Sequence, residues 1–271
     1  MNDTLYHYID PGFSHTQVGN YTLLLLLNAQ SFELAVMHGQ KLMVWRKAAP
    51  LAEITQPGEV QEVLSFSFHD IITGINTPYF TLVPQTLFEK DQVTEVARYL
   101  DVQATDTVFA QVLDANNQVV FKTQEALTLA AGKFDLQKVT FGSAGWILAI
   151  EANMPSNYSL YVNLHATTFD IAYFRHGKLH LYNTFEFTHE DELAYYNAFV
   201  CQQLKLDMSL TTVILSGEIM AGDNRYHNIL SNFFKTVELN TISVAELPAS
   251  LPNHQLLALT SLSLCASLAD A

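Results

Sequence analysis

Polar residues that could bind a ligand gather where one apolar segment ends and the next begins. The group consists of His165, Thr167, Thr168 and Asp170. The flanking segments 158–164 and 169–174 predict two strands joined by a tight turn, so these side chains share one hairpin. Such a hairpin could bind something small and of low charge. The alternative is that Thr168 and Asp170 only brace the turn through hydrogen bonds to its backbone.

A second polar group is the run His189-Glu190-Asp191-Glu192, which combines three acids with a histidine. Neighbouring positions diverge around a helix, so the run predicts a solvated helix N-terminus, where the helix dipole favours acids. The ten histidines show no H-E-x-x-H spacing and the two cysteines no C-x-x-C spacing, so no metal site is predicted. The chain also lacks a G-x-S-x-G elbow, a Walker loop and a G-x-G-x-x-G turn.

The overall composition excludes several classes of partner. The 271 residues are 49 % hydrophobic and 15 % charged, with a net charge of −14, which repels phosphate backbones and anionic lipid. The N-terminal segment has neither the basic nor the apolar region of a signal peptide. No stretch reaches the roughly 18 apolar residues of a membrane helix. We therefore expect a cytoplasmic protein without nucleic-acid partners or membrane insertion, in which Cys201 and Cys265 are buried thiols.

The chain carries an internal repeat. Segment 21–45, YTLLLLLNAQSFELAVMHGQKLMVW, aligns without a gap to segment 158–182, YSLYVNLHATTFDIAYFRHGKLHLY. The identical pairs include Leu27/Leu164, Ala29/Ala166, Phe32/Phe169 and Lys41/Lys178. Shared strand bias explains matched apolar positions, but not a matched alanine, phenylalanine and lysine as well. The sequence therefore predicts two related halves.

Each half reads as three strands, a helix and a further strand. In the second half the later elements are an alternating strand 179–187, a helix capped by Thr188, a strand 211–215, a helix 225–234 and a strand 236–239. In the first half the strands run to Trp45, a helix begins near Pro57, and 79–83 is the strand that follows. A hairpin at 107–122 and a helix at 124–133 come next, then a strand at 137–141 and a helix at 144–153. The turn at 155–157 predicts the boundary between lobes.

This order of elements, made twice, resembles the actin-like ATPase superfamily, which includes actin, the Hsp70 ATPase domain, sugar kinases, FtsA and PilM. The resemblance implies an α/β fold, a duplicated ribonuclease H-like architecture with two lobes, each a mixed five-stranded sheet flanked by helices. The lobes would be 1–155, with an inserted hairpin and helix at about 107–135, and 156–271, with a C-terminal helix 254–268 packing back between them. Four strings resemble an uncharacterised bacterial family of this fold: TLVPQTLF at 81–88, YNTF at 182–185, ED at 190–191 followed by YY at 195–196, and LSGE at 215–218.

The resemblance implies a phosphate-binding hairpin in each lobe, and both depart from the family pattern. In pilus and division proteins the second-lobe pattern is V-D-x-G-G-G-T-x-D-I-A, which lies over 162–172. Thr168 and Asp170 fit, but Asn163 replaces the magnesium-binding Asp, and the three glycines are replaced by His165, Ala166 and Thr167. In the first lobe Leu26 or Asn28 takes the Asp position, depending on register, and Gln30 takes a glycine position. The adenosine-contacting turn, usually Thr-Gly-Gly, reads Ser216-Gly217-Glu218.

An amide cannot supply the charge that magnesium prefers, and side chains in place of glycines occupy space that phosphates need. We therefore expect a non-catalytic binding or scaffold module without a cofactor or metal, whose partner is a protein or a second copy. The alternative is an ATP-binding protein, an ATPase or a small-molecule kinase with a rewired Mg-ATP site; a third is a self-assembling filament. The vestigial cleft between the lobes would be lined by Asn28, Gln30, Ser31, Asn163, His165, Thr167, Thr168, Asp170, Ser216, Gly217 and Glu218.

Overall fold

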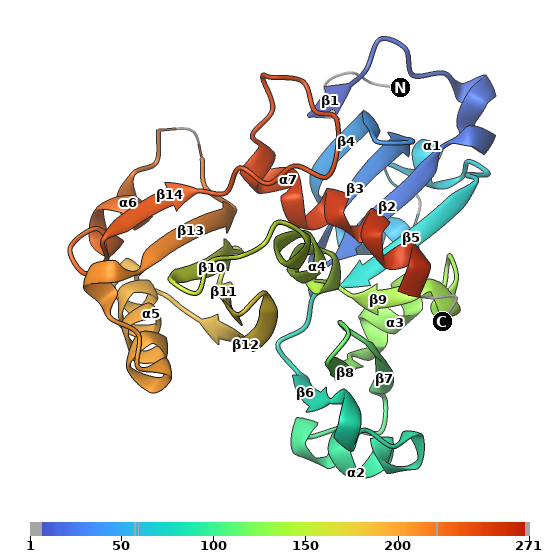
Figure 1. Ribbon diagram of the computed structural model, residues 1–271. Helices are drawn as coiled ribbons and strands as arrows, with labels where there is room; N and C mark the ends of the chain where they lie inside the picture. The colour runs from blue at the N-terminus through green and yellow to red at the C-terminus, as the bar shows by residue number, and fades with distance from the viewer. Residues whose placement is uncertain (1–6, 57, 59, 221, 269–271) are drawn as a thin grey trace. The chain divides into compact units, whose positions relative to one another are not determined.

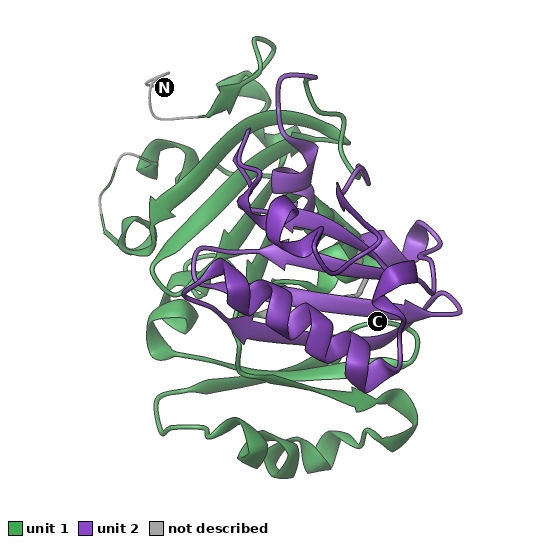
Figure 2. Cartoon of the chain, turned by 90° about the vertical axis from the view of Figure 1, so that its left-hand side faces the viewer, with its two compact units in different colours: residues 1–148, 244–248, 258–271 green, residues 149–243, 249–257 purple. Residues whose placement is uncertain are grey.

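The computed structural model describes residues 7–56, 58, 60–220 and 222–268, and the chain divides into two compact units (Figures 1 and 2). Unit 1 contains residues 1–148, 244–248 and 258–271, and unit 2 contains residues 149–243 and 249–257. The predicted start of a helix at Pro57 lies outside the described residues. The lobe boundary at residue 155 and a helix packed between the lobes stay predictions.

A six-stranded sheet forms the centre of unit 1, in the order β1-β4-β3-β2-β5-β9. Its strands are β1 (Tyr8–Ile9), β2 (Thr22–Leu27), β3 (Ser31–His38), β4 (Lys41–Pro50), β5 (Asp70–Ile75) and β9 (Val139–Phe141). Strand β2 pairs antiparallel with β3 and parallel with β5. All five leucines at 23–27 are buried, because a central strand with both faces covered excludes water from both sets of side chains.

The strand that pairs parallel with β2 differs from the prediction. The sequence predicts 79–83 in that place, but β5 occupies it and Phe80–Pro84 belongs to another sheet. Strand β5 contains Gly74, and glycine weakens the local strand pattern. A Cβ at position 74 would lie 2.7 Å from Leu262 Cδ2, so the glycine makes room for the C-terminal segment.

The helices of the first half and of the C-terminal segment are short. They are α1 (Gln61–Leu64), α2 (Val93–Ala97), α3 (Glu125–Ala131), α4 (Ala144–Ala152) and α7 (Asn253–Thr260). The 3₁₀ helices are His15–Asn20, Leu51–Ile54, Gln85–Leu87, Lys90–Gln92, Arg98–Leu100, Leu136–Lys138, Met208–Leu210 and Ser261–Leu268. Within unit 1, Gly145 lies against the backbone of Ser261, since a Cβ on Gly145 would be 2.3 Å from the Ser261 carbonyl oxygen. The last helical turns therefore pack on the start of α4.

A separate three-stranded sheet, in the order β6-β8-β7, also belongs to unit 1. Its strands are β6 (Phe80–Pro84), β7 (Thr107–Val112) and β8 (Asn117–Thr123). The turn between β7 and β8 is held by Asp114, whose Oδ1 accepts hydrogen bonds from the backbone N–H groups of Asn116 and Asn117. The hairpin predicted at 107–122 is therefore present, with β6 as a third strand.

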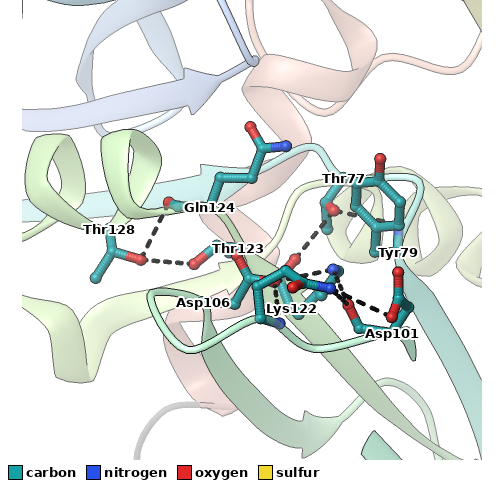
Figure 3. Close-up of polar contacts among 9 residues, drawn as sticks. Thr77, Tyr79, Asp101, Asp106, Lys122, Thr123, Gln124 and Thr128 are labelled. Carbon is teal, nitrogen blue, oxygen red and sulfur yellow. Dashed lines mark hydrogen bonds and ion pairs between the residues drawn. The ribbon is translucent and has the colours of Figure 1, made fainter. Parts of the chain in front are cut away.

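A buried ion pair fastens the loop before β7 to this sheet (Figure 3). Lys122 Nζ lies 2.9 Å from Asp106 Oδ2 and donates to the Asp101 carbonyl at 2.7 Å, and both charged side chains are less than 8 % exposed. The Tyr79 ring lies beneath the ammonium, with its centroid 4.6 Å from Nζ. The pKa of Asp106 is lowered by the hydrogen bond from the Gln103 N–H and by Lys122. The Lys122 ammonium therefore contacts the Asp106 carboxylate, the Asp101 carbonyl and the Tyr79 ring.

Unit 2 contains a five-stranded sheet in the order β12-β11-β10-β13-β14. Its strands are β10 (Ser159–Leu164), β11 (Thr168–Arg175), β12 (Lys178–Glu186), β13 (Thr212–Gly217) and β14 (Thr236–Leu239). The first three are antiparallel, and β13 and β14 run parallel to β10. The order and directions match β4-β3-β2-β5-β9 of unit 1, and Leu27↔Phe32 and Leu164↔Phe169 are equivalent pairs.

Two helices of unit 2 differ slightly from their predicted bounds. Helix α5 (Glu190–Leu204) is capped at His189 rather than Thr188, and Glu192 Oε2 accepts hydrogen bonds from the backbone N–H groups of both. Helix α6 (Arg225–Leu230) ends four residues earlier than predicted. Arg225 contacts Asp223 and Glu190, which ties the start of α6 to the start of α5.

Candidate functional site

The β10–β11 hairpin places three predicted site residues on one face of the unit 2 sheet. The His165 N–H donates to the Thr168 carbonyl at 2.9 Å and closes the tight turn through Ala166 and Thr167. Asn163 stands directly opposite Asp170 in the ladder. Because side chains alternate between faces, Asn163, His165 and Asp170 point to the same side.

The centre of this group is an ion pair between His165 and Asp170. His165 Nε2 lies 2.9 Å from Asp170 Oδ2, and the side chains are 22 % and 3 % exposed. Burial raises the pKa of Asp170, but the charge of His165 and hydrogen bonds from His165, Thr184 and Tyr182 outweigh it, so the pKa is lowered overall. Thr184 Oγ1 donates to the other carboxylate oxygen at 2.7 Å. The carboxylate is therefore held ionised by the chain itself.

Asn163 adds an unusual feature to the same face. Its Nδ2 lies 3.3 Å from His165 Nε2 and 3.5 Å from Asp170 Oδ2. Its Oδ1 is buried and accepts no hydrogen bond from any residue that the structure describes. Turning the amide over would set the oxygen against the Asp170 carboxylate, so the amide orientation is fixed by charge. One buried acceptor thus remains available to a donor.

The end of β13 closes this face from the neighbouring strand. Gly217 is opposite Leu164 and has a φ of +87°, and a Cβ there would lie 2.1 Å from the Leu164 carbonyl oxygen and 2.8 Å from Asn163 Oδ1. Only glycine fits this conformation and this approach. Ser216 is buried and accepts a hydrogen bond from Asn240 Nδ2 at 3.1 Å. Glu218 is exposed, and its N–H donates to the Leu164 carbonyl.

Unit 1 has a hairpin of the same form with different side chains. The Asn28 N–H donates to the Ser31 carbonyl at 2.8 Å, as His165 does to Thr168. Leu26 stands opposite Glu33, in the places that Asn163 and Asp170 occupy in unit 2. Asn76 Nδ2 donates to Asn28 Oδ1 at 3.0 Å. Gln30 is exposed, and its carbonyl accepts from the Leu51 N–H.

The predicted site residues thus fall into two sets, one in each unit. Asn163, His165 and Asp170 are in mutual contact, Gly217 adjoins Asn163, and Thr167 and Thr168 contribute backbone carbonyls. Residues Asn28, Gln30 and Ser31 form the turn of unit 1, and a cleft that combines both sets stays a prediction. The sequence reasoning did not assign Thr184, Tyr182, Asn240 and Asn76 to the site. The string Tyr182-Asn183-Thr184-Phe185 was the available signal for two of them.

Other candidate sites receive no support. Across the described residues, no group of three or more His, Cys, Asp or Glu side chains is arranged to hold a metal ion. The same residues include no helix that is long and apolar enough to span a membrane. In the run 189–192, the Glu192 carboxylate accepts a hydrogen bond from the His189 N–H and so caps the helix N-terminus.

The His165–Asp170 pair makes the free energy of unfolding depend on pH in the acid range. Because the pKa of Asp170 is lower in the folded chain than in the unfolded one, its contribution is complete above the unfolded value of about 3.9 and is lost as pH falls further. We expect the stability difference between wild type and Asp170→Asn to shrink as pH drops from 6 to 3. Urea unfolding at each pH measures it, with the exposed Asp91→Asn as control. A difference that does not change with pH would contradict the assignment.

Comparison with solved structures gives the fold. A Bacteroides thetaiotaomicron protein described as having an actin-like ATPase fold and unknown function is 19 % identical, with a TM-score of 0.74 over 93 % of this chain and 98 % of that one. The PilM–PilN type IV pilus biogenesis complex contains a chain that is 13 % identical, with a TM-score of 0.61 over 90 % of this chain and 97 % of that one. The predicted actin-like ATPase fold is confirmed.

Sequence comparison gives the family. No curated protein matches the chain. The sequence profile described as "Protein of unknown function (DUF3822)" matches residues 10–237, which is most of the chain. The resemblance to an uncharacterised family of this fold is likewise confirmed. The protein therefore belongs to the DUF3822 family and has an actin-like ATPase fold.

Proposed function

We propose that this protein is a non-hydrolysing member of the actin-like fold, a binding or scaffold module whose phosphate hairpins have degenerated. The observation that carries the proposal is the ion pair between His165 and Asp170 at 2.9 Å. In a phosphate hairpin of this fold, a carboxylate would face a metal ion and glycines would face phosphate. Here the buried carboxylate already has an imidazole of the same chain as its partner.

The amide at position 163 supports the same conclusion. Magnesium prefers hard anionic oxygens, and Asn163 offers a neutral oxygen beside a carboxylate that is already paired. The imidazole of His165 occupies the turn where a glycine would let backbone N–H groups approach an anion. Both features weaken the affinity for a magnesium–triphosphate complex.

The hairpin of unit 1 supports it as well. Leu26 is buried opposite Glu33, so the strand end carries an apolar side chain where a magnesium ligand would stand. We infer that the chain arose by internal duplication, because both sheets share strand order, direction and hairpin register. Under that inference both copies lost the phosphate-binding residues.

The partner that we propose is a protein in the cytoplasm. The net charge of −14 disfavours a nucleic acid. A solved structure of the same fold contains PilM together with PilN, so a protein partner is compatible with this fold.

One observation favours a second candidate function, an ATP-binding protein with a rewired site. The unpaired, buried Asn163 Oδ1 is an acceptor that a ligand N–H, a hydroxyl group or a cation would satisfy.

Calorimetric titration of the full chain with Mg-ATP, together with a phosphate-release assay, tests the proposal. We expect no binding up to roughly 1 mM ATP and no phosphate release above the buffer rate. Binding in the micromolar range, with turnover that Asn163→Ala abolishes, would overturn it and support the second candidate.

A restored variant sharpens this test. Asn163→Asp combined with His165→Gly places two carboxylates side by side and removes the imidazole, so we expect magnesium to stabilise the variant against heat but not the wild type. Sodium chloride at equal ionic strength is the control. Equal stabilisation of wild type and variant by magnesium would show that the native hairpin already binds the ion.

A further inference from the structure

Strand β7 has one edge that no other strand covers. It is an outer strand of the three-stranded sheet and, among the described residues, pairs with β8 alone (Figure 1). Its six residues pair with β8 in one continuous register without a bulge. Ala110, in the middle of the strand, is exposed, and its two neighbours on the same face, Val108 and Val112, are half-buried. The open edge of β7 therefore lies at the surface.

The hydrogen bonds at the turn between β7 and β8 show which backbone groups of β7 point outward. The Leu113 N–H donates to the Asn117 carbonyl at 2.9 Å, so this pair belongs to the set that exchanges hydrogen bonds. Such pairs alternate along an antiparallel ladder, and the register therefore directs the backbone groups of Thr107, Phe109 and Gln111 toward β8. The N–H and C=O groups that point away from β8, and that have no hydrogen-bond partner among the described residues, are those of Val108, Ala110 and Val112.

The other outer strands carry the devices by which proteins block such edges. Strands β1 and β9 are only two and three residues long, and β6 ends in Pro84. Strand β14 is four residues long and contains Glu238, and β12 has charged residues at both ends and a register shift against β11. Strand β7 has the sequence TVFAQV, which contains no charge, proline or glycine. An apolar edge of this kind is prone to aggregate when it stays uncovered, so we expect a partner to cover it.

The charge around this edge decides which partner fits it. Residues 80–123 include six acidic and three basic residues, a net charge of −3, and the whole chain has a net charge of −14. Asp101 is exposed, and its carbonyl accepts a hydrogen bond from Lys122, the residue opposite Val108 in the ladder, so Asp101 lies near the start of β7. A second copy of the chain would bring the same negative charge and be repelled, whereas a segment rich in lysine or arginine is attracted.

We propose that β7 binds an extended, positively charged segment of a protein partner, which joins the sheet as a fourth strand. The backbone of the segment bonds to the outward N–H and C=O groups of Val108, Ala110 and Val112. Apolar side chains at alternate positions of the segment lie beside these three residues, and basic residues flank them. The inference goes beyond the proposed function, because binding of Mg-ATP to the hairpins would contradict that function and leave the β7 edge unaffected.

Two synthetic peptides test the chemistry of the partner by fluorescence anisotropy with the full chain. The first peptide, KVTVTVK, carries valine at alternate positions and lysine at both ends, and the second, EVTVTVE, differs from it only in charge. We expect the lysine peptide to bind with a Kd of about 100 µM or tighter, and the glutamate peptide to bind at least about tenfold more weakly. Added sodium chloride should reduce this difference, because salt screens exposed charges.

Substitutions in β7 and at Asp101 separate backbone pairing from charge. Ala110→Pro removes one outward N–H where an edge strand tolerates proline, so we expect an unchanged circular dichroism spectrum and an affinity for the lysine peptide at least about tenfold lower. Ala110→Ser keeps that N–H and is the matched control, with the wild-type affinity. Asp101→Asn removes an exposed charge at a left-handed backbone position that asparagine tolerates, and should weaken the lysine peptide about twofold to threefold. Asp191→Asn, the same change on an exposed residue of unit 2, should have no effect.

Four results would overturn the proposal. The first is a lysine peptide that does not bind at roughly 1 mM. The second is equal affinity for the two peptides, and the third is wild-type affinity in a folded Ala110→Pro chain. The fourth is dimerisation of the wild type in sedimentation velocity that Ala110→Pro abolishes, because a second copy would then be the segment that covers β7.

Discussion

Replacing Gly217 with alanine is expected to destabilise unit 2 by about 2–5 kcal/mol, which is a large part of the 5–15 kcal/mol of a typical protein. Two penalties add. The backbone at Gly217 has a φ of +87°, which costs an alanine about 1–2 kcal/mol. The added Cβ would lie 2.1 Å from the Leu164 carbonyl oxygen and 2.7 Å from the Leu164 nitrogen, so β10 and β13 must separate, at a further 1–3 kcal/mol or so.

The matched control is Gly177→Ala in the same unit. Gly177 has a φ of +75° but open space around its Cβ position, so it isolates the conformational penalty. Hydrogen exchange of the β10 and β13 amides is the preferred measurement, because both tryptophans, Trp45 and Trp146, lie in unit 1. Equal losses in the two variants would show that the backbone approach at Leu164 is looser than the structure indicates.

The Lys122→Met variant is expected to lose about 3–5 kcal/mol, since it leaves the Asp106 carboxylate buried without its counter-ion. Lys122 also holds the Asp101 carbonyl and lies over the Tyr79 ring, so the loop before β7 loses its attachment (Figure 3). Fluorescence-detected urea unfolding measures the loss in unit 1.

Two further variants show whether that loss of stability comes from charge or from packing. Lys138→Met breaks the ion pair with Asp70, whose side chains are 47 % and 26 % exposed, and should cost only about 0–1 kcal/mol. Adding Asp106→Leu to Lys122→Met removes the orphaned charge and should recover part of the stability. A double variant that is no more stable than Lys122→Met would mean that the loss comes from packing rather than charge.

The sequence predicts an element correctly where the residues of that element and its immediate neighbours are enough to define it. Thr236–Leu239 is β-branched and bounded by polar residues, and its strand has the predicted ends. The sequence analysis does not predict strand β5, because its Gly74 is needed to make room for Leu262. Leu262 lies almost two hundred residues later in the chain, and no local pattern indicates that contact. The cap of α5 is displaced by one residue because Glu192 serves both Thr188 and His189.

The same distinction holds in the candidate site. The alternation of a hairpin suffices to place His165 and Asp170 on one face. Alternation does not predict Thr184 and Asn240, because they reach the site through the register of β12 on β11 and through the turn after β14. Buried polar partners of this kind are set by strand pairing over long separations, which a periodic pattern does not encode.

The path of the chain between the units bears on how the protein is made. Residues 1–148 emerge from the ribosome first, yet unit 1 also needs residues 258–268, which fill the space left by Gly74 and Gly145. At 5–20 residues per second, about 6–24 s separate the two events. During that interval β5 and α4 lack the neighbours that Leu262 and Ser261 give to Gly74 and Gly145 in the folded unit. Translation therefore supplies all the residues of unit 2 before it supplies the last segment of unit 1.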